Sequence, residues 1–337
     1  MSYSFEFNVP ADPRAMRHVD ERAVAALDAA LGAGTGAEVM HGIDPRRILT
    51  FAAGGPPVWS VAVASRGDVH QFLTYGLSRQ LDRSSPFDFE LTMRVRQAGP
   101  SPMWPMLLLR SIARYHLSTG RQIAPGEFLD MAGPISQVPV APAERASMPT
   151  THLTTLFIVE GARVPTPAGE IPLRNVVGLA PAELELLESC RAATFAKTLA
   201  SADPSLTVAL DRPTLATNPA FRAAIEQAAR SEGSDCKAVC IPGLAWRKEP
   251  DAFMISIPPS GAGKLARRIA SRLPFGEGLI AHSNATGPGT EVLIVPEAEL
   301  CVPNWDERRI VLGMPEHSPY LSFLREGQGA EWRLRTG

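Results

Sequence analysis

The sequence predicts an α+β protein of two domains, in which each domain is a mixed β-sheet flanked by helices. The chain has 337 residues, which is long enough for two domains. Strand-like and helix-like stretches occur in both halves, and a segment typical of a linker, DRPTLATNP, separates them at residues 211–219. We therefore expect a first domain over residues 1–210 and a smaller α+β domain over 220–337.

The first half begins with a helical pattern over residues 13–31 that stops at a glycine-rich stretch. Residues 58–64 and 69–75 are strand-like, and the sequence RGD at 66–68 between them predicts a hairpin.

The clearest strand pattern in the chain is FDFELTMRVR at residues 87–96. Its apolar side chains fall on one face and its polar side chains on the other, which is the period of a strand. Burial of each large apolar side chain contributes roughly 1.5–3 kcal/mol, so the apolar face is predicted to be core. We expect the other face, which carries Glu90 and Arg94, to be solvated.

A helix is predicted over WPMLLLRSIARYHLST, because Pro105 suits a first turn and Gly120 suits a helix end. Residues 124–150 are rich in small residues and proline, so we expect a long irregular loop. The rest of this domain is predicted as a strand, a hairpin turn, a second strand and a helix, at residues 153–159, 167–170, 171–177 and 181–199.

In the second half, Asn218 and Pro219 supply an N-cap and a first helical residue for a helix that ends near Ser231. The remaining predicted elements are a helix at 262–273 and strands at 252–257, 278–282, 290–295 and 308–313.

Composition argues against several classes of function. A net charge of −2 gives no chain-wide attraction for nucleic acid. The seven histidines show no metal-ligand spacing, and Cys236 and Cys240 lack a second pair, so we expect no metal and no cofactor. The N-terminus shows no leader pattern and no apolar run could span a bilayer, which predicts a cytoplasmic protein without a membrane partner.

The stretch LTYGLSRQ at residues 73–80 is similar to a G-x-S-x-G turn that exposes a nucleophilic serine. Gln80 replaces the second glycine, and no long helix follows, so the tight turn is disfavoured. A hydrolase that uses Ser78 is kept as an alternative, which a histidine within hydrogen-bond reach would revive.

The stretch PPSGAGK at residues 258–264 lacks the glycine and the hydroxyl residue of a phosphate-binding loop. The helix that follows carries four basic residues, which we interpret as a solvated face, with a small surface for an acidic partner as the alternative: Lys264, Arg267, Arg268 and Arg272.

Six motifs in order resemble the suppressor of fused-like domain family over roughly residues 40–213: TYGLS, FELTMRV, WPMLLLRSIARY, APGE, AGEIPLRNVVGLAPAEL and DRPTL. Beyond the linker, the pattern of strands and helix resembles the C-terminal half of the animal member more loosely. The Ala-, Arg- and Pro-rich composition is similar to that of a bacterial protein.

The resemblance implies a role in binding rather than catalysis. The animal member restrains transcription factors of the Hedgehog pathway by clasping a short peptide between its two domains through β-strand addition. The tyrosine and the aspartate that help to hold that peptide correspond to Tyr115 and Glu127 here, and Glu127 adds a methylene that changes the hydrogen-bond geometry. Bacterial relatives resemble immunity proteins of polymorphic toxin systems.

We therefore expect a cytoplasmic immunity or inhibitor protein that binds a peptide segment of a toxin or another protein in a groove between the domains. Tyr115 and Glu127 are the leading candidates for partner binding. Glu90 and Arg94 are further candidates, which otherwise pair with each other across a solvated strand face. A regulatory scaffold without a toxin partner is the remaining alternative.

Overall fold

The chain divides into two compact units. The computed structural model describes residues 20–32, 38–41, 60–81, 85–137, 148–285, 288–315 and 324–335. The first unit comprises the described residues of Met1–Pro181 and Leu199–Thr214, and the second those of Ala182–Thr198 and Leu215–Gly337. Residues 13–19 of the first predicted helix lie outside the described part of the chain.

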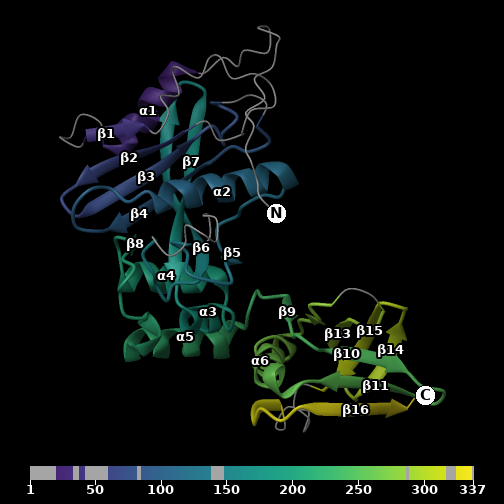
Figure 1. Cartoon of the computed structure of the whole chain (residues 1–337). Coiled ribbons are helices and arrows are strands. Elements are labelled where there is room, and N and C mark those ends of the chain that lie inside the picture. The colour runs from purple at the N-terminus through teal and green to yellow at the C-terminus, as the bar shows by residue number, and fades with distance from the viewer. Residues whose placement is uncertain are drawn as a thin grey trace. The chain divides into compact units, whose positions relative to one another are not determined.

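The first unit is built on one mixed sheet in the order β1-β2-β3-β4-β7-β6-β5, with β8 paired to β4 (Figure 1). β4 runs parallel to β7, and the other neighbours in the order are antiparallel. Both predicted hairpins are present, whereas β5 lies in a stretch that was predicted as a loop. From β1 to β8 the strands span Glu38–His41, Ser60–Arg66, Val69–Tyr75, Glu90–Arg96, Phe128–Asp130, Thr155–Thr166, Gly169–Leu179 and Thr207–Val208.

Helices cover both faces of this sheet (Figure 1). α1 (Glu21–Leu31) packs Leu27 into a core cluster on one face. α2 (Trp104–Thr119) packs Leu108 into a second cluster on the other face. A sheet that is covered on both sides buries side chains from both faces of its central strands.

The central strand β4 has buried side chains on both of its faces. Its predicted apolar face is confirmed, since Phe87, Phe89, Leu91, Met93 and Val95 are all buried. The prediction that the opposite face is solvated is wrong for part of the strand, because the side chains of Glu90 and Thr92 are also buried.

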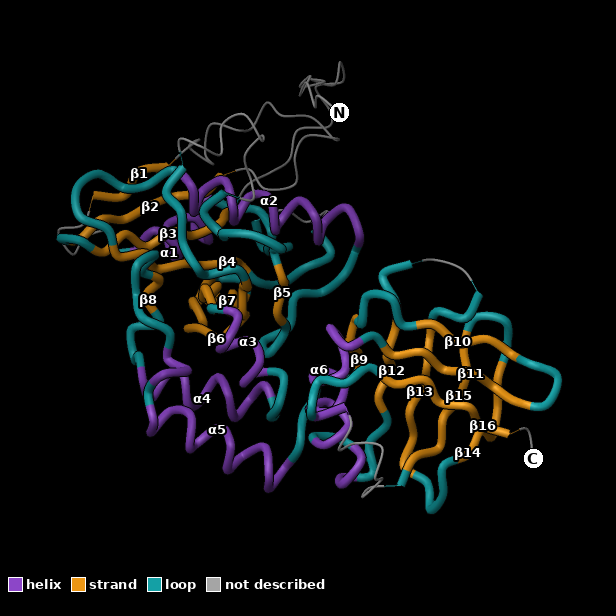
Figure 2. The backbone as a smooth tube through the Cα atoms, turned by 60° about the horizontal axis from the view of Figure 1, so that its bottom comes forward, coloured by secondary structure: helices purple, strands orange, loops and turns teal. Residues whose placement is uncertain are grey.

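The second unit contains a five-stranded mixed sheet, β14-β15-β13-β12-β9, and a three-stranded antiparallel sheet, β10-β11-β16 (Figure 2). α6 (Pro259–Ala270) packs Leu265 and Ile269 into a core cluster that both sheets share. β9, β10, β14 and β16 were not predicted, and each of them is an outer strand of its sheet. From β9 to β16 the strands span Ala238–Cys240, Ala245–Lys248, Ala252–Ile257, Leu279–His282, Glu291–Pro296, Cys301–Trp305, Arg309–Met314 and Ala330–Arg335.

The helix predicted over residues 181–199 is two helices, α3 (Pro181–Leu187) and α4 (Ala192–Ala202). Residues 182–198 cluster with the second unit. The ring of Phe195 in α4 meets that of Phe221 edge-on, with centroids 5.8 Å apart, and so packs against α5 (Pro219–Glu232).

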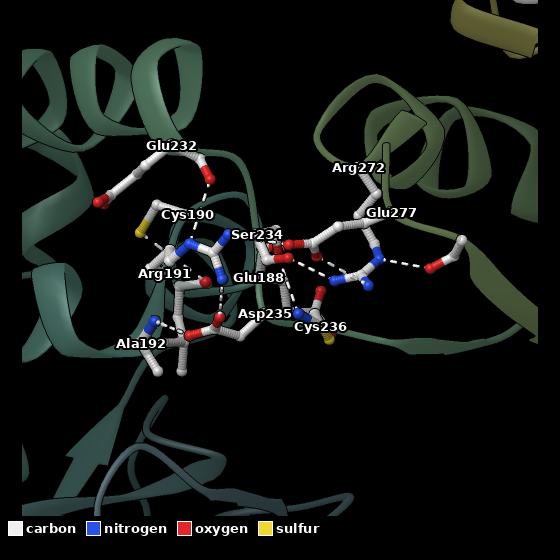
Figure 3. A network of polar contacts seen from close by, with 12 residues as sticks. Glu188, Cys190, Arg191, Ala192, Glu232, Ser234, Asp235, Cys236, Arg272 and Glu277 are labelled. Atoms are coloured by element: carbon white, nitrogen blue, oxygen red, sulfur yellow. Dashed lines mark hydrogen bonds and ion pairs between the residues drawn. The ribbon is translucent and has the colours of Figure 1, made fainter. Parts of the chain in front are cut away.

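A polar network ties the α3–α4 segment to the rest of the second unit (Figure 3). Arg191 lies between the two helices and donates to Asp235 at 2.8 Å and to Glu277 at 2.9 Å. Glu277 also pairs with Arg272 at 3.0 Å. Because one carboxylate serves two arginines, the network joins residues that are far apart in the sequence.

Candidate functional site

The corner where α2 ends and β5 begins contains both leading candidates from the sequence. α2 stops at Gly120, whose φ of 67° is the left-handed conformation that glycine adopts easily. The hydroxyls of Ser118 and Thr119 donate to the carbonyl of Tyr115 at 2.8 and 2.9 Å. The end of α2 is therefore closed by its own side chains, and Tyr115 is held at its surface with 49% of its area exposed.

Glu127 closes a tight turn that leads into β5. Its N–H donates to the carbonyl of Ala124 at 3.1 Å, and Pro125 and Gly126 occupy the middle of the turn, where Gly126 has a φ of 91°. One carboxylate oxygen of Glu127 accepts the N–H of Ala124 at 3.0 Å. Within the described part of the chain the other oxygen accepts no hydrogen bond, which leaves it available to a ligand.

His116, which sequence reasoning missed, connects these two residues. The rings of Tyr115 and His116 meet edge-on, with centroids 5.0 Å apart. Burial lowers the pKa of His116, and the carbonyl of Arg121 and the charge of Glu127 oppose that change. Nδ1 lies 2.9 Å from the Arg121 carbonyl, whereas Nε2 is buried without a partner among the described residues. A polar group of a ligand could satisfy this nitrogen.

Arg174 of β7 is a second residue that the sequence did not indicate. Its guanidinium lies 3.6 Å from the centroid of the buried Phe89 ring, which is a cation–π contact. Burial lowers its pKa, while the charges of Asp88, Glu127 and Glu160 oppose the change. Nη1 is buried and has no hydrogen-bond partner among the described residues. The strand pattern around Arg174 does not indicate that its guanidinium is partly buried against Phe89.

β5 is an outer strand of its sheet, and no described strand pairs with its other side. The N–H of Ile158 in β6 donates to the carbonyl of Glu127 at 2.9 Å, so Glu127 faces β6. Because the backbone groups of successive residues in an antiparallel strand face alternate sides, those of Phe128 and Asp130 face outward. Such an edge can accept a further strand.

Glu90 and Arg94, the other two residues predicted to bind a partner, do not lie at this corner. The carboxylate of Glu90 lies at the end of β3, where it accepts the N–H groups of Gly76 and Ser78 at 2.9 and 2.8 Å. It is fully buried, so it offers no surface to a partner. Arg94 is exposed and donates to Gln71 at 3.4 Å, and it does not pair with Glu90.

Ser78 is not placed as a nucleophile. Its side chain is fully buried, and its Oγ accepts the N–H of Gln80 at 3.2 Å. The YGLS stretch instead forms hydrogen bonds to Glu90. Gly76 has a φ of 119°, and this turn directs the N–H groups of Gly76 and Ser78 toward the carboxylate.

The basic residues of α6 are mostly neutralised within the second unit. Arg268, predicted on a solvated face, is buried, donates to the Glu188 carbonyl and pairs with the Glu188 carboxylate. Arg267 pairs with Glu185 at 3.5 Å. The prediction of a solvated face is therefore wrong for Arg268, which lies against Glu188. It is also wrong for the buried Arg272, which lies against Glu277.

Metal-ligand clusters and membrane-spanning helices are both lacking among the residues that the structure describes. No group of three or more His, Cys, Asp or Glu side chains among them could hold a metal ion. No helix in these ranges combines the length and the apolar character needed to cross a bilayer.

Comparison with known proteins agrees with the motifs. Residues 54–213 match the family described as Suppressor of fused protein (SUFU), which confirms the resemblance predicted from the six motifs. No curated protein matches the chain.

Several solved structures resemble the fold. The crystal structure of Drosophila Suppressor of Fused is 16% identical, with a TM-score of 0.63 over 94% of this chain and 92% of that one. At this identity the likeness shows the fold, and it confirms the predicted α+β class. The Sufu–Fu complex structure is 18% identical (TM-score 0.48, 62% and 96% covered), and a SUFU homolog from Neisseria gonorrhoeae is 9% identical (0.39, 58% and 96%).

Proposed function

We propose that this chain is a non-enzymatic protein-binding module that grips an extended segment of a partner at the β5 edge. The observation that carries the proposal is the outer side of β5, with which no described strand pairs, at the corner that holds Tyr115 and Glu127. Backbone groups on that edge can pair with an added strand, while the neighbouring side chains select its sequence. The match to the suppressor of fused family supports the same conclusion.

The corner also supplies groups of the right chemistry for such a ligand. Tyr115 offers an exposed ring and hydroxyl, and Glu127 offers a carboxylate oxygen. His116 and Arg174 each hold a buried nitrogen without a partner among the described residues, and an unpaired buried nitrogen costs about 1–3 kcal/mol. A bound segment that satisfied either nitrogen would recover part of that cost.

Catalysis by Ser78 is disfavoured by its burial. We further propose that the chain acts in the cytoplasm as an immunity or inhibitor protein, and that its partner is a toxin or another protein that it restrains by occupancy. A regulatory scaffold would use the same edge on a partner that is not toxic.

A proline at Phe128 tests the edge. Phe128→Pro removes the outward N–H, and the matched Phe128→Ala removes the ring but keeps the N–H. The partner is recovered from the native cell with the wild-type chain, identified by mass spectrometry and titrated against each purified variant. We expect Phe128→Pro to bind about tenfold more weakly than Phe128→Ala, as the loss of one hydrogen bond implies.

Equal affinities of the two variants would reject strand addition at β5. Expression of the recovered partner alone and together with this chain then separates the two roles. Growth arrest that this chain relieves identifies an immunity protein, and a partner that does not affect growth identifies a regulatory scaffold.

A further inference from the structure

The hairpin between β2 and β3 holds a serine hydroxyl against an imidazole. Ser65 lies near the end of β2, and His70 is the second residue of β3. The register of the two strands places these residues directly opposite each other, so their side chains share one face of the sheet. Oγ of Ser65 lies 2.8 Å from Nδ1 of His70, which is hydrogen-bond distance.

The other ring nitrogen of His70 determines which group donates this hydrogen bond. Nε2 lies 3.0 Å from the backbone carbonyl of Gln97. A carbonyl oxygen only accepts, so Nε2 carries the ring proton and Nδ1 of the neutral imidazole has none. The hydroxyl of Ser65 is therefore the donor. A serine that donates to the unprotonated nitrogen of an oriented imidazole has the arrangement of a nucleophile with its base.

The base is fixed in place, whereas the hydroxyl lies near the surface. His70 is buried, while Ser65 is only half-buried and is followed by the exposed turn at residues 66–68. The N–H of Gln97 donates to the carbonyl of Asp68 at 2.8 Å, which ties Gln97 to the same turn. The carbonyl that orients the ring is thus attached to the hairpin itself. The pair keeps its geometry without a ligand, and this preorganisation favours reaction at Ser65.

The hairpin is well determined without the Ser65–His70 hydrogen bond. β2 and β3 pair in continuous register over the whole of both strands. Gly67 in the turn has a φ of 61°, the left-handed conformation that tight hairpin turns require. The pair also meets a requirement that Ser78 does not, because the side chain of Ser78 is fully buried. Of these two serines, Ser65 is the one that a reagent can approach.

We propose that Ser65 is a covalent modification site that accepts an acyl group from an activated ester, with His70 as its general base. In this step Oγ of Ser65 bonds to the acyl carbon, and the bond from that carbon to the leaving oxygen breaks. The hydroxyl proton passes to Nδ1 of His70 and then to the leaving oxygen. The products are an ester on Ser65 and a free alcohol, so the step needs no further reactant. Because it ends with a modified serine, it is independent of partner binding at β5.

Treatment of the full chain with p-nitrophenyl acetate at neutral pH tests the proposal. Release of p-nitrophenolate gives the overall rate, and mass spectrometry of peptides locates each acetyl group. Ser111 is the internal control, because it is exposed and its hydroxyl donates to the carbonyl of Leu107 at 2.8 Å rather than to an imidazole. We expect Ser65 to be acetylated about a hundredfold faster than Ser111, as assistance by a general base implies.

Two histidine variants separate the base from the other imidazoles of the chain. His70→Gln removes the base but keeps an amide that can donate to the carbonyl of Gln97, and His152→Gln removes an exposed histidine elsewhere. Circular dichroism melts verify that both variants are folded. We expect His70→Gln to slow acetylation of Ser65 about a hundredfold and His152→Gln to leave it unchanged.

The wild type alone can reject the proposal, whether or not His70→Gln folds. Ser65 that stays unmodified, or that reacts no faster than Ser111, would overturn it. An undiminished rate at Ser65 in folded His70→Gln would also overturn it, because the hydrogen bond would then only hold the hairpin.

Discussion

The carboxylate of Glu90 accepts the backbone N–H of Ser78 at 2.8 Å, and this bond explains the unusual stretch around that serine. The N–H of Gly76 donates to the same oxygen at 2.9 Å, and the hydroxyl of Thr74 donates to the other oxygen at 2.6 Å. A buried acid thereby replaces the missing backbone pairing between the end of β3 and the start of β4.

Glu90 should make the stability of the protein depend on pH. Burial raises its pKa from the ordinary 4.5 to about 7, although the hydrogen bonds from Thr74, Ser78 and Gly76 oppose the rise. Between these two values the folded chain holds a proton that the unfolded chain releases. The contribution is therefore fully present below pH 4.5 and is lost as pH rises through 7, by about 3 kcal/mol in total.

Glu90→Gln tests this dependence, because glutamine keeps an oxygen for the two amides and cannot titrate. We expect urea denaturation at pH 5 and pH 7.5 to show a smaller loss of stability in Glu90→Gln than in the wild type. Parallel changes in the two proteins would show that Glu90 keeps the same pKa on unfolding.

Gly76 should resist substitution, because its φ of 119° lies in a region that L side chains rarely adopt. We expect Gly76→Ala to lower the free energy of unfolding by about 1–3 kcal/mol, from backbone strain and from displaced donors to Glu90. Gly133→Ala is the control, since an added methyl group there meets nothing within 4 Å. Urea denaturation of both variants measures the difference, and similar values would contradict the assigned role of Gly76.

Tyr115 should matter for binding and not for folding. Its side chain is half exposed, and its hydrogen bonds with described residues use only its backbone carbonyl, so Tyr115→Ala should leave the unfolding midpoint nearly unchanged. If Tyr115 is an anchor, the same variant should weaken the complex with the recovered partner by about 2 kcal/mol in a calorimetric titration. Tyr115→Phe, which keeps the ring, separates loss of the ring from loss of the hydroxyl. Undiminished affinity of Tyr115→Ala would remove this residue from the site.

The buried pair of Glu188 and Arg268 should show strong coupling. The side chain of Arg268 is 4% exposed and that of Glu188 is 11% exposed, so Glu188→Ala leaves a buried cation without its acid. We expect Glu188→Ala to cost about 3–5 kcal/mol, and Glu188→Ala/Arg268→Met to cost less than that single change. A double-mutant cycle in urea gives the coupling, and additive costs would mean that the pair does not stabilise the α3–α4 segment.

The sequence by itself determined the parts of this protein that depend on local periodicity. The apolar side of β4, the hairpin at residues 66–68, the ends of α2 and the N-cap at Asn218 all follow from neighbours within a few residues. The family resemblance depends likewise on the order of short motifs. Tyr115 and Glu127 were chosen on that basis, and their proximity at one corner follows from the short loop between them.

Only the tertiary structure decided the rest, because burial of a polar group depends on what covers it. Glu90 is buried with its carboxylate against groups from residues 74–78, which are distant in sequence, and no local pattern reports this. The three-residue strand β5 exists through its pairing with β6 and has too few residues for a period. The burial of His116 and Arg174, which each keep a nitrogen without a partner among the described residues, is likewise a tertiary property. Contacts between residues that are far apart in the sequence cannot be predicted from a local pattern of apolar and polar residues.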